Sequence, residues 1–237
     1  MLQIFIVFHK YIFDECYENI PQDILDKYFT FVAVNPQIIK EYTLNKYKVI
    51  NEWELPVYDK FFQEKGYNEN SAIYHIYINN LHKNYKNIGF FQYDMKFNNL
   101  NNINQIDKII ENMNNNTYYC ISQDTFDECC YGKWIDDKVI FRSIDDYEKY
   151  FKIKFSKNEK YPLFNSYIIS KIAYIKIMKW IIQTYDTVYS SSGLFRDNAG
   201  HMGGLYERLM AFAIGQEKLT PILMDISHDT DYKTKAY

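Results

Sequence analysis

The sequence predicts an α/β protein built on a Rossmann-type, mostly parallel sheet flanked by helices. Short apolar runs at residues 3–8, 28–34 and 88–91 have the length and residue types of buried strands. Segments with helical character separate these runs, so strand, crossover and strand follow one another as βαβ units require. A chain of 237 residues can bury a sizeable core and fits one large domain or two small ones. We expect a single domain over residues 1–237.

The composition is that of an ordinary globular protein. Hydrophobic residues make up 47% and charged residues 24%, and a formal net charge of -3 gives no reason to expect nucleic-acid binding. The aromatic share of 19% fits either a codon preference or a carbohydrate-binding surface. No apolar stretch reaches the roughly 20 residues of a membrane-spanning helix, and the four cysteines lack zinc-type spacing. We therefore expect a cytoplasmic protein with reduced thiols.

The first predicted strand ends in three residues with side chains suited to ligand binding, His9, Lys10 and Tyr11. In an open α/β sheet, ligands bind just beyond the carboxyl ends of the strands. Lys10 can meet a phosphate there, and Tyr11 can stack on a base or a sugar. The alternative is that both are solvated loop residues.

The region between the second and third strands contains one clear helix. The second strand closes at the Asn35-Pro36 turn, and residues 38–66 are expected to be loop with short helical pieces. Polar residues at 68–71 then start a helix that extends to about residue 84 and carries a buried apolar stripe. This helix leads into the strand at residues 88–91.

The strand at residues 88–91 ends abruptly in Gln92, Tyr93 and Asp94. A carboxylate at this edge of the sheet can hold a divalent cation, and a cation there can hold a diphosphate. Asp94 therefore either binds a metal or only caps the loop that follows a buried strand.

The second half of the chain continues the alternation less regularly. We expect His228 and Asp229, near its end, to be surface residues without a role in the site. The pattern predicts a surface helix within 103–113, strands at 117–121 and 165–169, a further strand at 134–141, a helix at 171–184 and a short apolar segment at 222–226.

Residues 190–204 form a Ser- and Gly-rich loop that also carries Arg196, Asp197 and His201. A loop of this kind inside a domain is usually functional or disordered. Its residue types are those of catalytic sites, which favours a functional loop.

A helix predicted at residues 205–214 follows this loop and places Glu207 in its first turn. The helix dipole favours a carboxylate there for structural reasons alone. The functional alternative is a general base held at the edge of the ligand crevice.

Several stretches together resemble a family of short bacterial and viral glycosyltransferases, a domain-of-unknown-function group found in capsular polysaccharide clusters. The order and spacing of the motifs fit over most of the chain. The matching stretches are the strand ending in His9-Lys10, the helical run Asn70–Asn80, the run Gly89–Phe97 and the run Gly203–Leu209, which reads Gly-Gly-Leu-Tyr-Glu-Arg-Leu.

The chain departs from this family at the end of its central strand. Gln92, Asp94 and Met95 replace a histidine and two arginines, so the local charge changes from cationic to anionic. An anionic motif needs a metal to hold a diphosphate, which moves the resemblance toward GT-A glycosyltransferases that use Mn²⁺ or Mg²⁺. The resemblance implies Asp94 and His201 as the metal ligands. The usual Asp-x-Asp pair would need an acid at Gln92.

The resemblance implies a GT-A-like hexosyl- or deoxyhexosyltransferase of polysaccharide biosynthesis. The donor would be a UDP-, GDP- or dTDP-linked sugar, and the acceptor a glycan. The nucleotide sugar would lie against five residues at the strand ends and one in the late loop, with Glu207 preferred over Asp197 as the base of an inverting reaction. These six expected substrate-binding residues are His9, Lys10, Tyr11, Gln92, Tyr93 and Arg196.

Two other functional classes are compatible with the predicted fold. A non-catalytic nucleotide- or sugar-binding module would keep the fold after losing the chemistry, and the altered motif at Asp94 is consistent with such a loss. A nucleotidyltransferase or hydrolase would also use metal-binding carboxylates, but the sequence has no Walker-type phosphate loop.

Overall fold

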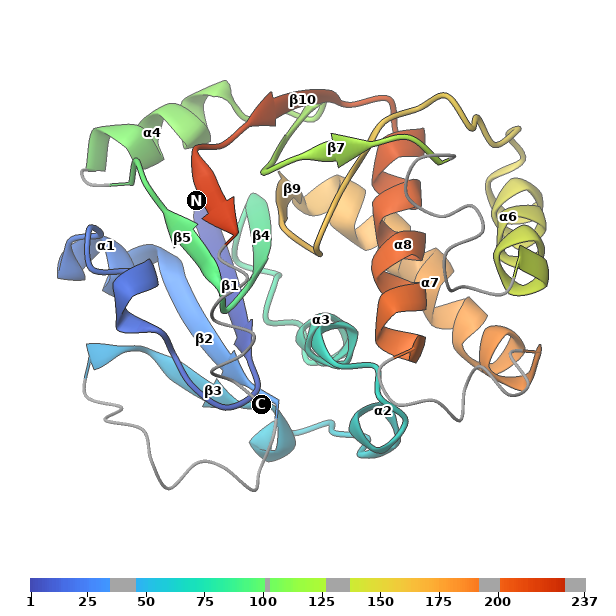
Figure 1. Ribbon diagram of the computed structural model, residues 1–237, viewed down its shortest axis with the longest axis horizontal. Coiled ribbons are helices and arrows are strands. Elements are labelled where there is room, and N and C mark those ends of the chain that lie inside the picture. Colours follow the sequence, from blue (N-terminus) through green and yellow to red (C-terminus); the bar gives the residue numbers. More distant parts are fainter. Residues whose placement is uncertain (35–45, 101–102, 127–136, 192–200, 229–237) are drawn as a thin grey trace.

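The computed structural model describes residues 1–34, 46–100, 103–126, 137–191 and 201–228, with the backbone alone for 137–138, 186–191 and 201. Within these ranges, a seven-stranded sheet has the order β10-β6-β9-β4-β1-β2-β3 (Figure 1). All its neighbours pair in parallel except β9, which is antiparallel to β4 and β6. The mostly parallel sheet is thus confirmed. Its strands are β1 (Leu2–Phe8), β2 (Phe29–Ala33), β3 (Val49–Asn51), β4 (Asn87–Gln92), β6 (Thr117–Cys120), β9 (Tyr167–Ser170) and β10 (Thr220–Leu223).

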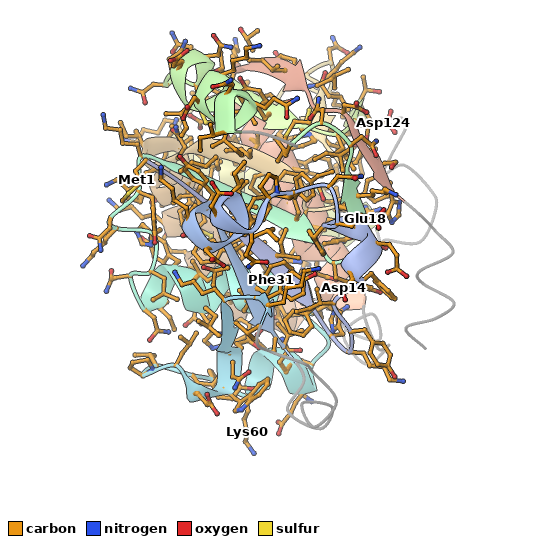
Figure 2. All side chains as sticks on the ribbon, turned by 90° about the vertical axis from the view of Figure 1, so that its left-hand side faces the viewer. Met1, Asp14, Glu18, Phe31, Lys60 and Asp124 are labelled. Carbon is orange, nitrogen blue, oxygen red and sulfur yellow. The ribbon has the colours of Figure 1, made fainter. Side chains whose placement is uncertain are left out.

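One face of the sheet is covered by short helices and by a small two-stranded sheet. Alternate residues of β1, such as Ile4 and Ile6, pack into this layer because successive side chains of a strand point to opposite faces. Figure 2 turns this side to the viewer: Asp14 and Glu18 lie on the outside, whereas Phe31 of β2 is 1% exposed. The layer comprises η1 (Asp14–Cys16), α1 (Gln22–Tyr28), α4 (Ile103–Asn112) and the antiparallel pair β5 (Met95–Phe97) and β11 (Ile226–His228).

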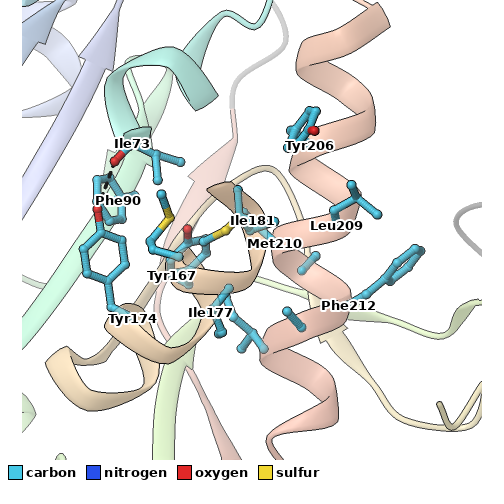
Figure 3. Close-up of a cluster of buried hydrophobic side chains, with 14 of the residues drawn as sticks. Ile73, Phe90, Tyr167, Tyr174, Ile177, Ile181, Tyr206, Leu209, Met210 and Phe212 are labelled. Atoms are coloured by element: carbon cyan, nitrogen blue, oxygen red, sulfur yellow. Dashed lines mark hydrogen bonds between the residues drawn. The ribbon is translucent and has the colours of Figure 1, made fainter. Parts of the chain in front are cut away.

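The opposite face carries the larger core. Phe5 and Val7 of β1 point into it, and the hydroxyl of Tyr174 donates a hydrogen bond to the carbonyl of Ile73 at 2.9 Å (Figure 3). Burying the Tyr174 ring is favourable because its apolar area leaves water while its hydroxyl keeps a partner. The helices are α3 (Glu69–Ile78), α7 (Lys171–Ser191) and α8 (His201–Gln216), with α6 (Asp137–Phe151) packed against α7.

Several predicted boundaries were wrong. Residues 137–141 belong to helix α6 and not to a strand, because the apolar run there continues with helical spacing through the buried Ser143 and Tyr147. Helix α8 begins at His201, four residues before its predicted start. The remaining elements are β3, η4 (Glu52–Glu54) and α2 (Phe61–Glu64), all in the stretch predicted as loop with helical pieces, and the short pair β7 (Gln123–Asp124) and β8 (Tyr161–Pro162).

Cys16 and Cys120 are buried free thiols, and Cys129 and Cys130 lie outside the described residues. Within the described ranges, no helix combines the length and the apolar character needed to cross a bilayer.

Candidate functional site at the carboxyl ends of β1 and β4

The chain brings two predicted site segments together where β1 and β4 end. These strands are parallel neighbours, with Val7 paired to Gln92, so the residues after each strand emerge at the same edge of the sheet. His9 follows β1, and Asp94 lies in the turn between β4 and β5. The ring of Tyr93 lies between these segments, edge-on to His9 at a centroid distance of 6.1 Å.

His9 is held by a carboxylate from helix α3. Its Nε2 lies 3.1 Å from Oε1 of Glu69, the first residue of that helix, and the His9 side chain is 28% exposed. Burial lowers the pKa of His9, but the hydrogen bond to Glu69 and the negative charges of Glu69, Glu52 and Asp94 outweigh burial, so the pKa is raised above 6.5. His9 therefore binds a proton more readily than a free histidine side chain does.

Asp94 is paired with a residue from the end of the described chain. The small sheet formed by β5 and β11 aligns His228 with Met95, and Nε2 of His228 lies 3.0 Å from Oδ2 of Asp94. Asp94 is 1% exposed, and the His228 side chain is 13% exposed. The expectation that His228 is a surface residue without a role in the site was therefore wrong. No local sequence pattern signals this contact, because 134 residues separate the partners.

The second oxygen of Asp94 has no hydrogen-bond partner in the part of the chain that the structure describes. Oδ1 is buried and unpaired among the described residues. A buried carboxylate oxygen without a donor is costly, because desolvation is not offset. A divalent cation would offset this cost, and carboxylate oxygen is a ligand that Mg²⁺ and Mn²⁺ accept. The residues at Asp94 thus fit a cation, although the described ranges hold no group of three or more metal-binding side chains.

Phe164 and Asn165 form a strained segment beside this pair. Both residues have left-handed backbones, with φ of 61° and 49°, and the Phe164 ring packs 4.8 Å from the ring of His228. Asn165 is 4% exposed, and neither its Oδ1 nor its Nδ2 has a hydrogen-bond partner among the described residues. Strain and an unsatisfied amide at a strand edge point to a ligand-binding role, which the sequence analysis missed.

The remaining predicted substrate residues line the same edge. Gln92 is the last residue of β4, and Tyr93 is 6% exposed, with its carbonyl accepting the hydroxyl of Tyr17 at 3.2 Å. Lys10 and Tyr11 follow His9, and Nζ of Lys10 lies 5.4 Å from the centre of the Tyr11 ring. Tyr93 is therefore a packed wall of the site, whereas Lys10 and Tyr11 are partly exposed.

The start of α8 packs against residues 66–70 at Gly203. The amide of Gly203 donates to the carbonyl of Gly66 at 2.9 Å, and Nδ2 of Asn70 donates to the carbonyl of Gly203 at 2.8 Å. A Cβ on Gly203 would lie 2.8 Å from Nδ2 of Asn68. Glu69, which bonds His9, also lies in this segment, residues 66–70. The start of α8 and the end of β1 therefore both contact residues 66–70.

The predicted residues of the late loop are only partly described. His201 begins α8, but the structure describes its backbone alone, so its role as a metal ligand stays a prediction. Arg196 and Asp197 lie outside the described residues. Glu207 lies in the second turn of α8 and not in the first, and its Oε1 accepts a hydrogen bond from Nη1 of Arg208 at 3.1 Å.

A polar network with buried Glu52, Ser71 and His75 at its centre fixes α3 behind the site. Oε1 of Glu52 accepts the Ser71 hydroxyl at 2.5 Å and Nδ1–H of His75 at 2.8 Å, and Oε2 accepts Nε2–H of Gln63 at 2.9 Å. Nε2 of His75 accepts the backbone amide of Asp59 at 2.9 Å, which assigns the proton to Nδ1. The triad-like set of Ser, His and Glu is therefore structural, because both ring nitrogens are engaged and all three residues are buried.

Comparison with solved structures identifies the class of fold. The WbbM bifunctional glycosyltransferase, in an apo structure, aligns with 97% of this chain at a TM-score of 0.62 and 11% identity. The alignment covers 45% of that chain, so this protein spans less than half of it. Mouse xyloside xylosyltransferase 1, also apo, aligns with 94% of this chain and 85% of its own at 13% identity and a TM-score of 0.41.

The chain therefore has the fold of a glycosyltransferase, with a mostly parallel sheet flanked by helices. Searches with protein-family models and among curated proteins find no match. The narrower resemblance to the capsular polysaccharide family stays a prediction.

Proposed function

We propose that the chain is a metal-dependent glycosyltransferase that moves a sugar from a nucleotide-sugar donor to a saccharide acceptor. The observation that supports this proposal best is Asp94, a buried carboxylate with one unpaired oxygen, next to His228 at the carboxyl edge of a glycosyltransferase fold. Ligands of open α/β sheets bind at this edge.

Asp94 would hold the cation, with His228 as the second protein donor. An imidazole donor favours Mn²⁺ over Mg²⁺, because Mg²⁺ prefers oxygen ligands in strict octahedral geometry. A bound cation would offset the negative charge that develops on the leaving diphosphate. His201 remains a proposed further ligand.

The chain's own residues would bind the donor at its two ends. His9, whose pKa is raised by its hydrogen bond to Glu69, and Lys10 would face the phosphates, and Tyr11 would stack on the base or the sugar. The unpaired amide of Asn165 would hydrogen-bond hydroxyls of the transferred sugar. A buried amide that is satisfied only by the ligand discriminates strongly between sugars that do and do not carry the matching hydroxyl.

The acceptor hydroxyl needs a base if the reaction inverts. Glu207 is one candidate, but Arg208 lies beside its carboxylate, and a base has to leave an ion pair before it takes a proton. Asp197 is therefore an equal candidate in this proposal. Arg196 would reach a phosphate or a sugar hydroxyl.

The first prediction tests the metal site. Purified protein is incubated with UDP-, GDP- and dTDP-sugars and Mn²⁺, and nucleotide release is measured with and without a chelator. We expect chelation to stop release, and Asp94→Asn to lower it by at least about 100-fold, because a charge-stabilising group at the leaving diphosphate is lost. His228→Ala serves as a second site variant, and Asp107→Asn on α4 serves as the matched control. Full activity of Asp94→Asn would remove the metal assignment.

A non-catalytic binding module is the second candidate, favoured by the single acid in the motif that ends at Asp94. It predicts that donor binds in the presence of Mn²⁺ without nucleotide release. Calorimetric binding of the same nucleotide sugars therefore separates the two candidates.

A further inference from the structure

The basic residues of the chain are unevenly distributed. The whole sequence has 27 Lys and Arg against 30 Asp and Glu, whereas residues 142–179 contain nine of the former and four of the latter. This stretch of 38 residues covers much of α6 and the first part of α7. A net-negative protein thus carries one strongly positive region.

Lys171, from this region, contacts Lys83 and Lys86, from outside it, at the amino end of β4. The backbone amide of Lys171 donates to the carbonyl of Lys86 at 2.7 Å, and its Nζ donates to the carbonyl of Lys83 at 2.8 Å. No described carboxylate lies within ion-pair distance of these three lysines. Their positive charge is felt nearby, since Lys171 and Lys83 add to burial in lowering the pKa of His82.

The exposed side of α7 extends this surface. Ile172 is 63% exposed, and Lys176 and Lys179 follow it on the same helical face at i+4 and i+7. Residues 171–184 contain no acid. Among the described residues, Lys176 is the one lysine on this face with an ion-pair partner, Glu217 at 2.7 Å. The inner side of α7 is buried in the core, so the helix presents a fixed basic face with an exposed apolar residue in its first turn.

We propose that this surface, defined by Lys83, Lys86, Lys171, Lys179 and Ile172 and here called the lysine patch, docks the protein on a bilayer rich in anionic lipids. Basic residues around an exposed apolar side chain are typical of surfaces that lie in the membrane interface. Ile172 favours a bilayer over a nucleic acid, because a phosphate backbone offers an isoleucine no apolar environment. This inference goes beyond the proposed function and does not depend on it.

The lysine patch lies at the other end of the sheet from the candidate site. Lys86 precedes β4, and Gln92 ends it, so the two regions are separated by the length of this strand, roughly 17 Å. Substitutions in the lysine patch therefore leave His9, Asp94 and their partners untouched. A docked molecule would keep its site clear of the bilayer surface.

Vesicle co-sedimentation of the full chain tests the proposal. The probes are vesicles of phosphatidylcholine alone and of three parts phosphatidylcholine to one part phosphatidylglycerol. We expect binding to the anionic vesicles at about 0.1 M salt and release at about 1 M, where the screening length falls from about 10 Å to about 3 Å. Absence of binding to anionic vesicles at the lower salt concentration would overturn the proposal.

Charge and apolar contributions are separated by variants. The triple variant Lys83→Gln, Lys86→Gln, Lys171→Gln should lower the partition coefficient on the order of 100-fold, since each lysine near the surface contributes about fivefold. Ile172→Ser should lower it about tenfold. The matched control replaces Lys48, Lys60 and Lys65 with Gln; Lys60 projects far from Met1 and the amino end of β1 (Figure 2). Circular dichroism checks that all variants fold.

Two results would refute the lysine patch as a docking surface. One is an equal loss of binding in the control triple variant, which would indicate a diffuse charge effect. The other is binding of duplex RNA by the wild-type protein that is tighter than its binding to the anionic vesicles and that the Lys83, Lys86, Lys171 triple variant loses, which would indicate a nucleic-acid surface instead.

Discussion

At the scale of single residues, the site depends on two histidines that meet carboxylates across long stretches of chain. His9 contacts Glu69, 60 residues away, and His228 contacts Asp94, 134 residues away. Both pairs lie beyond strand ends that the fold brings to one edge. Each carboxylate fixes the orientation of an imidazole, so neither histidine is an isolated surface group.

The His9 pair predicts how stability depends on pH. The folded protein raises the pKa of His9, so the pair contributes its full stability below the unfolded value of about 6.5 and loses it as pH rises through the higher folded value. His9→Gln should therefore cost more stability at pH 5.5 to 6 than at pH 9. Urea unfolding of both proteins at these pH values measures the difference, and a cost that grows with pH would contradict the pairing.

The residues of the site differ in how far the sequence could reveal them. Asp94, His9 and Lys10 could be selected because they directly follow apolar runs, which is local information. His228 and Asn165 could not, since each depends on a neighbour far along the chain and has no motif of its own. The Glu52, Ser71 and His75 network was missed for the same reason.

At the scale of elements, the contact between α3 and α8 depends on a close backbone approach. A Cβ on Gly203 would lie 2.8 Å from Nδ2 of Asn68 and 3.1 Å from the carbonyl oxygens of Gly66 and Tyr67. The residue types predicted a functional loop at residues 190–204, but they do not explain why residue 203 is a glycine. The reason is steric and becomes visible only when the two helix starts are placed side by side.

Gly203→Ala should destabilise the protein by about 1–3 kcal/mol, although alanine is the better helix former. Denaturant unfolding measures this loss. Asn68 has a left-handed backbone with φ of 52°, so Asn68→Gly removes the nearest clashing group without backbone strain. The double variant should recover part of the loss. A Gly203→Ala protein as stable as wild type would show that the helix starts are further apart.

The Glu52 network makes a second prediction about an element, the attachment of residues 49–66 to α3. Glu52→Ala leaves two buried donors, on Ser71 and His75, and the half-buried donor of Gln63 without their acceptor. We expect a loss of about 2–5 kcal/mol, because an unsatisfied buried donor costs about 1–3 kcal/mol. Glu52→Gln keeps one acceptor oxygen and should cost less. Equal stability of Glu52→Ala and wild type in urea would contradict the network.

Elements were predicted well where periodicity was strong and wrongly where short apolar runs were ambiguous. The predicted strands β1, β2 and β4 were confirmed. Their mostly apolar runs of four to seven residues are typical of strands buried on both faces. The run Val139-Ile140-Phe141 is compatible with a strand or a helix. In the structure it belongs to helix α6, which packs against α7. The short strand β3 lacks any such run.

At the scale of the whole molecule, the sequence predicts the class of sheet but not its order. Alternating strands and helices imply parallel pairing, because crossovers return each strand in the same direction. The antiparallel strand β9 enters between β4 and β6, and nothing local distinguishes it from a parallel strand. Its insertion carries Phe164 and Asn165 to the edge where β4 ends, so this global feature builds part of the site.

Because the proposed site joins segments from both ends of the described chain, ligand binding should stabilise the whole fold. A ligand at about 100 times its Kd adds about 2.7 kcal/mol to the free energy of unfolding. For a protein of this size, that corresponds to a rise in Tm of about 5–10 °C. We expect this rise with Mn²⁺ plus one of UDP, GDP or dTDP, each tested separately by differential scanning calorimetry. Asp94→Asn should abolish it, and the Lys83, Lys86, Lys171 triple variant should retain it. An equal rise in Asp94→Asn would place the nucleotide elsewhere on the molecule, whatever its catalytic activity.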